Sequence, residues 1–344
     1  MRTLVNLAVR PGAVPAPRAE AAGFHAGLPG YAPTPVHDLG DGVFLKDESD
    51  RLGLPAFKVL GVSWAVERAL REHPEVRTLV AASAGNHGRA VAHVAAQRGL
   101  RARVFLPARS VVARREAIAG EGADVVIVDG TYEDAVRLAA EAAAHPGAIE
   151  LADVGASGPA HWVIDGYATL FAELDTASPG GAAAARDVAS PGPAPFTTIF
   201  VPVGVGSLGA AAARYGASVG ADVIAVEPDV AACLTASLVA GEPTVVDTPG
   251  TAMAGLDCAE VSEAAWPTLS AGIRGTVTVS DEQTAAAMRE LAARGLTIGH
   301  SGAAGLAGLH ALDGELRAAV TLDRVLLIAT EGPTDPEGYR AVMG

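Results

Sequence analysis

Short apolar runs alternate with alanine-rich amphipathic stretches along most of this 344-residue chain. Within about seventy residues, strand-like runs are interleaved with helical stretches: strands at 78–82, 102–106 and 124–128, and helices at about 88–98, 112–119 and 132–144. This repetition is typical of a parallel sheet covered by helices on both faces. The pattern returns at 198–202, 223–227 and 325–329. The sequence therefore predicts an α/β fold of two domains with open, mostly parallel twisted sheets.

The formal net charge of −14 argues against nucleic acid and anionic membranes as partners. No apolar run approaches the length of a membrane span, and the first ten residues lack the apolar core of a secretory signal. Cys233 and Cys258 form no CxxC pair, so we expect a cytoplasmic protein. The nine histidines show no HxxxH or HExxH spacing, and no metal is expected.

Lysine is almost absent from the chain. Of 25 cationic side chains only Lys46 and Lys58 are lysines, and the others are arginines. Arginine can solvate a surface, but its guanidinium is never deprotonated, whereas a lysine amine can lose its proton and attack a carbonyl. Composition alone leaves open that both lysines merely escaped a drift toward arginine.

A glycine-rich turn, SAGNHG at 83–88, lies between a predicted strand and a predicted helix. Glycines allow a tight turn, and a helix start presents N–H groups that suit a carboxylate or phosphate. The alternative is an ordinary turn in which Ser83 or Asn86 caps the helix. His87 alone would more often be a packed or capping histidine than a catalyst.

A second turn, GVGSLG at 204–209, also joins a strand to a helix and formally satisfies the GxGxxG pattern of dinucleotide sites. Asp222 precedes the next predicted strand instead of ending it, where a ribose ligand would belong. A cradle for a single phosphate fits better. Thr330 directly follows the last predicted strand, where it would meet a ligand at the carboxyl ends of the strands or simply close the domain in a polar turn.

A lysine for a Schiff base, a one-phosphate cradle, an asparagine-bearing turn and a strand-end hydroxyl are together what pyridoxal 5'-phosphate requires of a protein. These segments resemble those of the fold-type II pyridoxal-phosphate enzymes, the tryptophan synthase β/threonine dehydratase superfamily. They are most similar to its diaminopropionate ammonia-lyase branch, over nearly the whole chain. The most specific marks are AFKVLG at 56–61, SAGNHG at 83–88, WVIDGYATL at 162–170 and MAGLDC at 253–258.

The resemblance implies a role for each matching position. Lys58 would form the Schiff base with the cofactor, Phe57 belongs to the same cofactor-binding set, and Asn86 would bond the phenolate oxygen. Thr330 would face the pyridine nitrogen. The phosphate cradle would consist of Gly204, Val205, Gly206, Ser207 and Leu208. The residues near the substrate carboxylate would be Ser83, Ala84 and His87.

The resemblance also implies a homodimer and a division of the chain. Residues 1–70 and 167–344 would form a larger cofactor-binding domain, and 71–166 a smaller substrate-side domain. Residues 176–195 are rich in Ala, Gly, Ser and Pro, which is typical of a flexible surface loop.

The reaction implied is α,β-elimination on 2,3-diaminopropionate, a small amino acid, to give pyruvate and ammonia. The released Lys58 amine would abstract the α-proton, and Asp153 would recognise or protonate the leaving amine. The branch commonly carries Asp where this chain has Ala84, and that carboxylate is associated with the D-isomer, so we expect preference for the L-isomer. Relatives also often show Glu in place of His300.

Three other functions stay open on the sequence. An L-serine/L-threonine dehydratase-type or other β-eliminating lyase would use the same machinery without needing an acidic group for a β-amine. A nicotinamide oxidoreductase would explain the glycine turn but not the rare lysines. A protein that carries the cofactor without catalysis is the third.

Overall fold

The computed structural model describes residues 2–156, 158–176 and 195–344. The chain splits into two compact units, a larger one of Met1–Phe57 with Tyr167–Gly344 and a smaller one of Lys58–Gly166. One limit between the two units lies between Gly166 and Tyr167. The other limit lies between Phe57 and Lys58, and residues 58–70, which the sequence assigns to the larger domain, are part of a helix that packs in the smaller unit. Apart from its two end residues, the expected loop at 176–195 lies outside the described residues.

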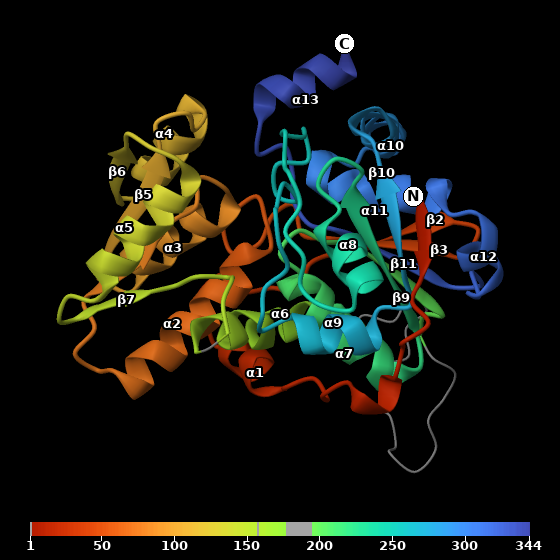
Figure 1. Cartoon of the computed structure of the whole chain (residues 1–344), viewed down its shortest axis with the longest axis horizontal. Helices are drawn as coiled ribbons and strands as arrows, with labels where there is room; N and C mark the ends of the chain where they lie inside the picture. Colours follow the sequence, from red (N-terminus) through yellow and green to blue (C-terminus); the bar gives the residue numbers. More distant parts are fainter. Residues whose placement is uncertain (1, 157, 177–194) are drawn as a thin grey trace. The chain divides into compact units, whose positions relative to one another are not determined.

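The larger unit contains a seven-stranded sheet in the order β1-β10-β9-β8-β11-β3-β2 (Figure 1). The inner strands are parallel, while β1 and β2 pair antiparallel at the two edges. The strands are β1 (Thr3–Val5), β2 (Val36–Gly40), β3 (Val43–Asp47), β8 (Thr198–Pro202), β9 (Asp222–Pro228), β10 (Gly275–Val279) and β11 (Val325–Ala329). The helices are η1 (Pro11–Ala13, 3-10), α1 (Glu20–Ala26), α7 (Ser207–Val219), α8 (Cys233–Ala240), α9 (Trp266–Gly272), α10 (Asp281–Ala293), α11 (His300–Ala311), α12 (Gly314–Ala318) and α13 (Pro336–Met343).

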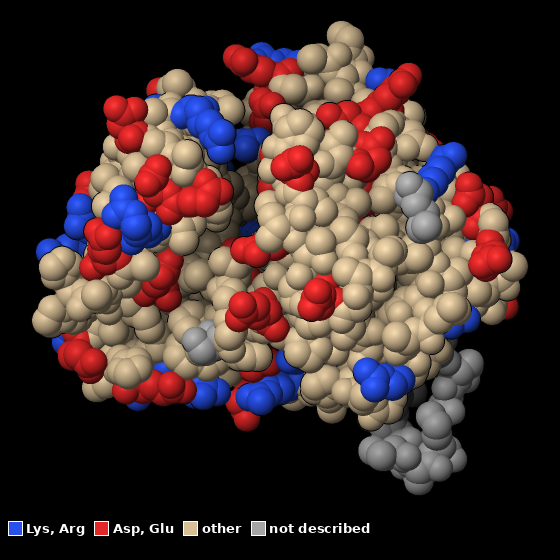
Figure 2. Space-filling model, viewed as in Figure 1, with Lys and Arg blue, Asp and Glu red and all other residues tan. Residues whose placement is uncertain are grey.

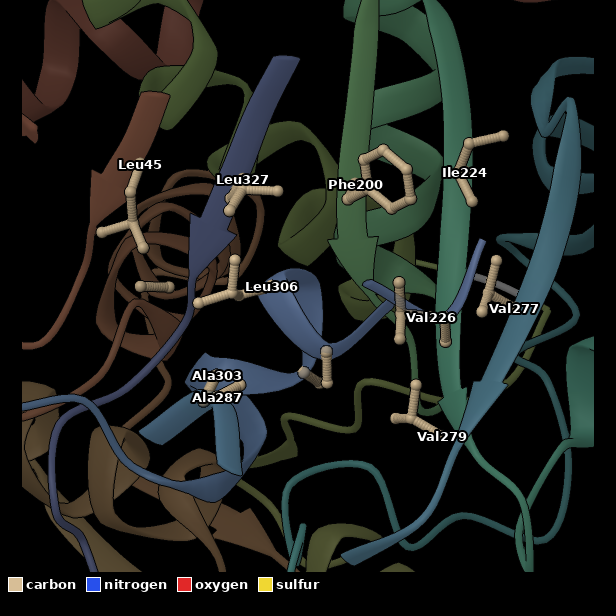
Figure 3. Packing of buried hydrophobic residues seen from close by; sticks show 14 of the residues in the cluster. Leu45, Phe200, Ile224, Val226, Val277, Val279, Ala287, Ala303, Leu306 and Leu327 are labelled. Atoms are coloured by element: carbon tan, nitrogen blue, oxygen red, sulfur yellow. The ribbon is translucent and has the colours of Figure 1, made fainter. Parts of the chain in front are cut away.

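Strands β8, β9 and β11 carry side chains that are buried on both faces of the sheet. Because successive strand residues point to opposite faces, alternate positions pack under different helices. A Cβ on Gly308 of α11 would meet Val226, whereas one on Gly216 of α7 would meet Val223, so the two helices cover opposite faces of β9. Figure 3 shows strand side chains such as Phe200 and Val226 together with Leu306 in the cluster on the α11 face. Core packing on both faces fixes where the strands end, and hence where the turns after them lie.

The smaller unit contains a four-stranded parallel sheet in the order β6-β5-β4-β7. Its strands are β4 (Thr78–Ala81), β5 (Arg101–Pro107), β6 (Asp124–Val128) and β7 (Ala148–Glu150). Its helices are α2 (Lys58–Glu72), α3 (Asn86–Gln97), α4 (Val112–Gly120) and α5 (Tyr132–Ala143), and α6 (Pro159–Thr176) begins in this unit and ends in the larger one. Thr131 and Asp134 form a capping box that starts α5.

Charged side chains of both signs are interspersed over the face of the molecule drawn in Figure 2. Among the described residues, none of the helices combines the length and the hydropathy that crossing a bilayer requires.

Candidate functional site

Two turns of the smaller unit follow neighbouring strands. The turn at 83–87 follows β4 and Asp153 follows β7, and these two strands pair in parallel. The carboxyl ends of parallel strands meet at one edge of a sheet, so residues far apart in the sequence converge there. A Cβ on Gly88 would lie 2.0 Å from the Ser83 carbonyl oxygen, so the turn closes on α3 only with glycine at this position.

Lys58 and Asp153 form an ion pair at this edge. Lys58 is the first residue of α2, and its Nζ donates to Asp153 Oδ2 at 2.7 Å. The two side chains keep 16 % and 19 % of their surface exposed, so both are partly accessible to solvent. Burial acts to raise the pKa of Asp153, but the positive charges of His87 and Lys58 and the hydrogen bond from Lys58 outweigh it and lower that pKa. Asp153 is therefore ionised at neutral pH.

His87 is buried behind this pair. Its Nε2 lies 2.6 Å from the Leu151 carbonyl oxygen, which can only accept, so Nε2 carries the proton. Its Nδ1 lies 3.7 Å from Asp153 Oδ2. Both ring nitrogens thus face groups of the smaller unit, and the expected contact of His87 with a substrate carboxylate stays a prediction. Ser83, Ala84 and Asn86 are partly buried in the same turn.

The larger unit holds the second glycine turn, between β8 and α7. Gly206 is the N-cap of α7 with φ of 96°, a conformation that favours glycine, and it has no side chain to occupy the first amides of the helix. A Cβ on Gly204 would lie 2.8 Å from Cys258 Sγ, and one on Gly206 would lie 2.5 Å from Leu269 Cδ1. The backbone of this turn is therefore tightly supported from behind, and its helix start suits a phosphate. Val205, Ser207 and Leu208 complete the predicted cradle.

Thr330 is buried directly after β11, which pairs in parallel with β8. Its carbonyl oxygen accepts a hydrogen bond from the Phe57 amide at 3.2 Å. The Phe57 ring lies 4.7 Å from that of Tyr167, centroid to centroid. Since Phe57 is joined to Lys58 by a peptide bond, the end of β11 fixes the backbone that leads into the lysine.

Two residues of the larger unit have no role that the sequence predicts. Glu331 is buried beside Thr330, and its carboxylate accepts the amide of Ser301. Ser301 directly follows His300 in the chain. Local sequence patterns do not predict this contact, because the two residues lie 30 positions apart.

Comparison with known proteins identifies the class of this chain. The pyridoxal-phosphate dependent enzyme family matches residues 28–331, so the chain belongs to that family. It is 34 % identical to a diaminopropionate ammonia-lyase of Salmonella typhimurium over 94 % of this chain and 91 % of that protein. The crystal structure of an Escherichia coli diaminopropionate ammonia lyase, in complex with an aminoacrylate-PLP azomethine reaction intermediate, covers 99 % of this chain and 96 % of its own with TM-score 0.86 and 30 % identity. A biosynthetic L-threonine dehydratase of Escherichia coli is 28 % identical over 81 % of this chain and 52 % of that protein.

The predicted fold class and cofactor are thereby confirmed: the chain has the fold-type II architecture, and its cofactor is pyridoxal 5'-phosphate. The residues present fit that cofactor. A partly exposed lysine amine begins α2, and a glycine turn without capping side chains begins α7. The residue roles drawn from the resemblance stay predictions.

Proposed function

We propose that this protein is a pyridoxal-phosphate-dependent ammonia-lyase that converts 2,3-diaminopropionate to pyruvate and ammonia. The proposal is supported by the similarity to diaminopropionate ammonia-lyases over nearly the whole chain. The observation that carries it is the pair of Lys58 and Asp153, a base and a carboxylate 2.7 Å apart. Elimination releases the β-amine as the first ammonia, and hydrolysis of the enamine that is left gives pyruvate and the second.

The chain's own residues divide the binding work. When bound, the cofactor supplies an electron sink conjugated to the substrate α-carbon. Lys58 would bond to it covalently, Asn86 would hold the phenolate oxygen, and Thr330 would offer a neutral hydroxyl to the pyridine nitrogen. Phe57 orients the backbone before Lys58. The amides of 204–208 and the Ser207 hydroxyl would hold the phosphate.

Lys58 and Asp153 divide the handling of protons and charge. The Lys58 amine, once free, would remove the α-proton. Because the pKa of Asp153 is lowered, its carboxylate holds a cation more readily than it gives up a proton. We therefore assign Asp153 to recognition of the substrate's β-ammonium, a group that serine and threonine lack. His87, whose Nδ1 faces the same carboxylate, keeps Asp153 ionised.

Ala84 supports preference for the L-isomer. Its methyl group can neither accept nor donate a proton, so this turn offers no second carboxylate for the opposite face of the substrate. Comparable turnover of D- and L-diaminopropionate by the purified protein would contradict this part of the proposal. The homodimer implied by the resemblance also stays a prediction, which sedimentation equilibrium can test.

A substrate panel tests the function. Purified protein is given L- and D-diaminopropionate, L-serine, L-threonine and O-phosphoserine, and pyruvate or 2-oxobutyrate release is measured. Asp153→Asn keeps the shape of the side chain and removes its charge, so turnover of diaminopropionate should fall about 10²-fold or more. A dehydratase should lose little from this substitution, and turnover of serine that exceeds that of diaminopropionate would favour that class.

A further inference from the structure

Glu331 caps helix α11 through Ser301, which lies thirty residues earlier in the sequence. Its carboxylate accepts the Ser301 amide on Oε1 at 3.3 Å and the Thr334 hydroxyl on Oε2 at 3.2 Å. Ser301 lies in the first turn of α11, whose N-cap, Gly299, has no side chain. Glu331 thus satisfies an amide at the start of α11 and places negative charge at the positive end of that helix.

The backbone around Glu331 leaves no room between this turn and α11. The Gly299 amide donates to the Glu331 carbonyl oxygen at 3.0 Å. A Cβ on Gly299 would lie 2.2 Å from the Gly332 carbonyl oxygen, and one on Gly302 would lie 2.5 Å from that of Glu331. The start of α11 and the turn after β11 are therefore one packed element.

Ser301 continues the contact toward the phosphate cradle. Its Oγ accepts the Gly255 amide at 3.1 Å. Gly255 belongs to the turn 253–258, which backs the cradle: a Cβ on Gly204 would lie 3.0 Å from the Gly255 carbonyl oxygen and 2.8 Å from Cys258 Sγ. Any outward movement of this turn would remove the wall behind Gly204.

The same turn after β11 also holds the segment that leads to Lys58. Glu331 forms an isolated antiparallel bridge with Ala56, and the Gly332 amide donates to the Pro55 carbonyl oxygen at 3.0 Å. Glu331 is thus in contact with two of the elements on which the cofactor site depends. One is the backbone before Lys58, and the other is the turn behind the phosphate cradle.

We infer that Glu331 is a positioning residue that fastens the wall of the phosphate cradle to the end of β11 through Ser301 and Gly255. The contacts run from the Glu331 carboxylate to the Ser301 amide, and from the Ser301 hydroxyl to the Gly255 amide. Glu331 touches neither substrate nor cofactor in this scheme. The inference rests on the cofactor of the family and not on diaminopropionate as the substrate.

Two variants interrupt these contacts at different points. Glu331→Ala removes the cap of α11, whereas Ser301→Ala keeps that cap and removes only the acceptor for Gly255. Hydrogen exchange followed by mass spectrometry on the holoenzyme should show faster exchange at 299–303 and 253–258 in Glu331→Ala, but only at 253–258 in Ser301→Ala. Titration of the apoprotein with pyridoxal phosphate should give a Kd raised about 10-fold or more in Glu331→Ala and about 3-fold or more in Ser301→Ala.

Matched controls separate this role from general loosening. Thr334→Val removes the hydrogen bond from the Thr334 hydroxyl to Glu331 and should leave exchange at 253–258 and the Kd as in the parent protein. Glu331→Gln keeps an acceptor for the Ser301 amide and should restore most of the affinity. The inference is overturned if Glu331→Ala binds the cofactor as the parent does, or if Thr334→Val loosens 253–258 equally.

Should Glu331→Ala fail to fold, Ser301→Ala decides alone: unchanged exchange at 253–258 or an unchanged Kd overturns the inference. Neither measurement involves substrate turnover. Failure of the proposed diaminopropionate activity would therefore leave both readouts intact, and failure of this inference would leave the activity proposal standing.

Discussion

The two lysines of this chain lie in opposite kinds of environment. Lys46 is completely buried in β3, where its ammonium donates to the Thr34 carbonyl oxygen at 2.8 Å and to Glu173 at 2.5 Å. Lys58 begins α2 with its amine partly exposed and bonded to Asp153. Rarity in the sequence marks both residues equally. Their surroundings differ: Lys46 is enclosed among buried charges, and Lys58 is the lysine for which we propose chemistry.

Lys46 belongs to a group of buried charges that we term the buried charge network. It consists of Lys46, Glu48, Arg51 and Glu173. Two cations balance two anions, and every charge has an opposite partner within hydrogen-bond distance. Burial acts to raise the pKa of Glu173, but hydrogen bonds and charge from Arg51 and Lys46 lower it. Charges matched in this way stabilise one arrangement and leave no group for a ligand.

Replacing Lys58 by arginine should have the largest effect on function. Lys58→Arg keeps the positive charge beside Asp153 but removes the amine that can bond to the cofactor and take a proton. We expect turnover to fall by about 10³-fold or more, with no lysine adduct after borohydride trapping, while the melting temperature changes little. Turnover within tenfold of the parent, or an adduct on another residue, would defeat the assignment of Lys58.

Replacing Lys46 by methionine should lower stability and leave turnover unchanged, the reverse of the result expected for Lys58. Lys46→Met leaves Glu173 with one cation fewer in a buried site, and the free energy of unfolding should fall by about 3–5 kcal/mol in urea titrations. Turnover per folded molecule should stay as in the parent. The double variant Lys46→Met/Glu173→Gln restores charge balance, so it should recover part of the loss. Equal destabilisation by single and double variants would show that the network is not held by charge balance.

The strands could be predicted from the sequence because their apolar runs are bounded by polar or turn residues. Strands β6, β8 and β11 have the expected limits, and the two units divide between Phe57 and Lys58, where α2 begins. The rarity of lysine and the surrounding motif predict a role for Lys58. The difference between the two lysines was not predictable, because Glu173 lies 127 positions from Lys46 and Asp153 lies 95 from Lys58. Such partners are set by packing and not by local pattern.

Glu227 extends the comparison to a buried carboxyl with neutral partners. Burial raises the pKa of Glu227 to about 7, despite hydrogen bonds from the Thr235 hydroxyl and the Leu234 and Thr235 amides. The folded protein then binds a proton more tightly than the unfolded chain between about pH 4.5 and 7, so this group's contribution to stability falls as the pH rises through that range. The expected loss is at most about 3 kcal/mol.

Glu227→Gln cannot titrate and supplies the control for this prediction. Urea unfolding of both proteins at intervals between pH 4.5 and 8 should show a falling component in the parent that the variant lacks. Other titrating groups cancel in the difference between the two proteins. If the difference in free energy of unfolding between the two proteins stays constant with pH, Glu227 is ionised in the folded protein, as Glu173 is. Neutral hydrogen-bond donors would then stabilise a buried carboxylate as well as cations do.

The smallest expected effect on the free energy of unfolding comes from an exposed ion pair. Its hydrogen-bond distance is like those in the buried charge network, but its side chains are not buried. Arg103 Nε donates to Asp124 Oδ2 at 2.9 Å across β5 and β6, and the side chains are 43 % and 62 % exposed. Water screens such a pair, so Asp124→Asn should lower the free energy of unfolding by less than about 1 kcal/mol, and by less again in 1 M salt. Lys46→Met measured under the same conditions should keep its large, salt-insensitive effect. If the two substitutions lower the free energy of unfolding equally, burial does not explain why the charges around Lys46 stabilise the fold. Lys46 and Lys58 would then differ only in their reactivity.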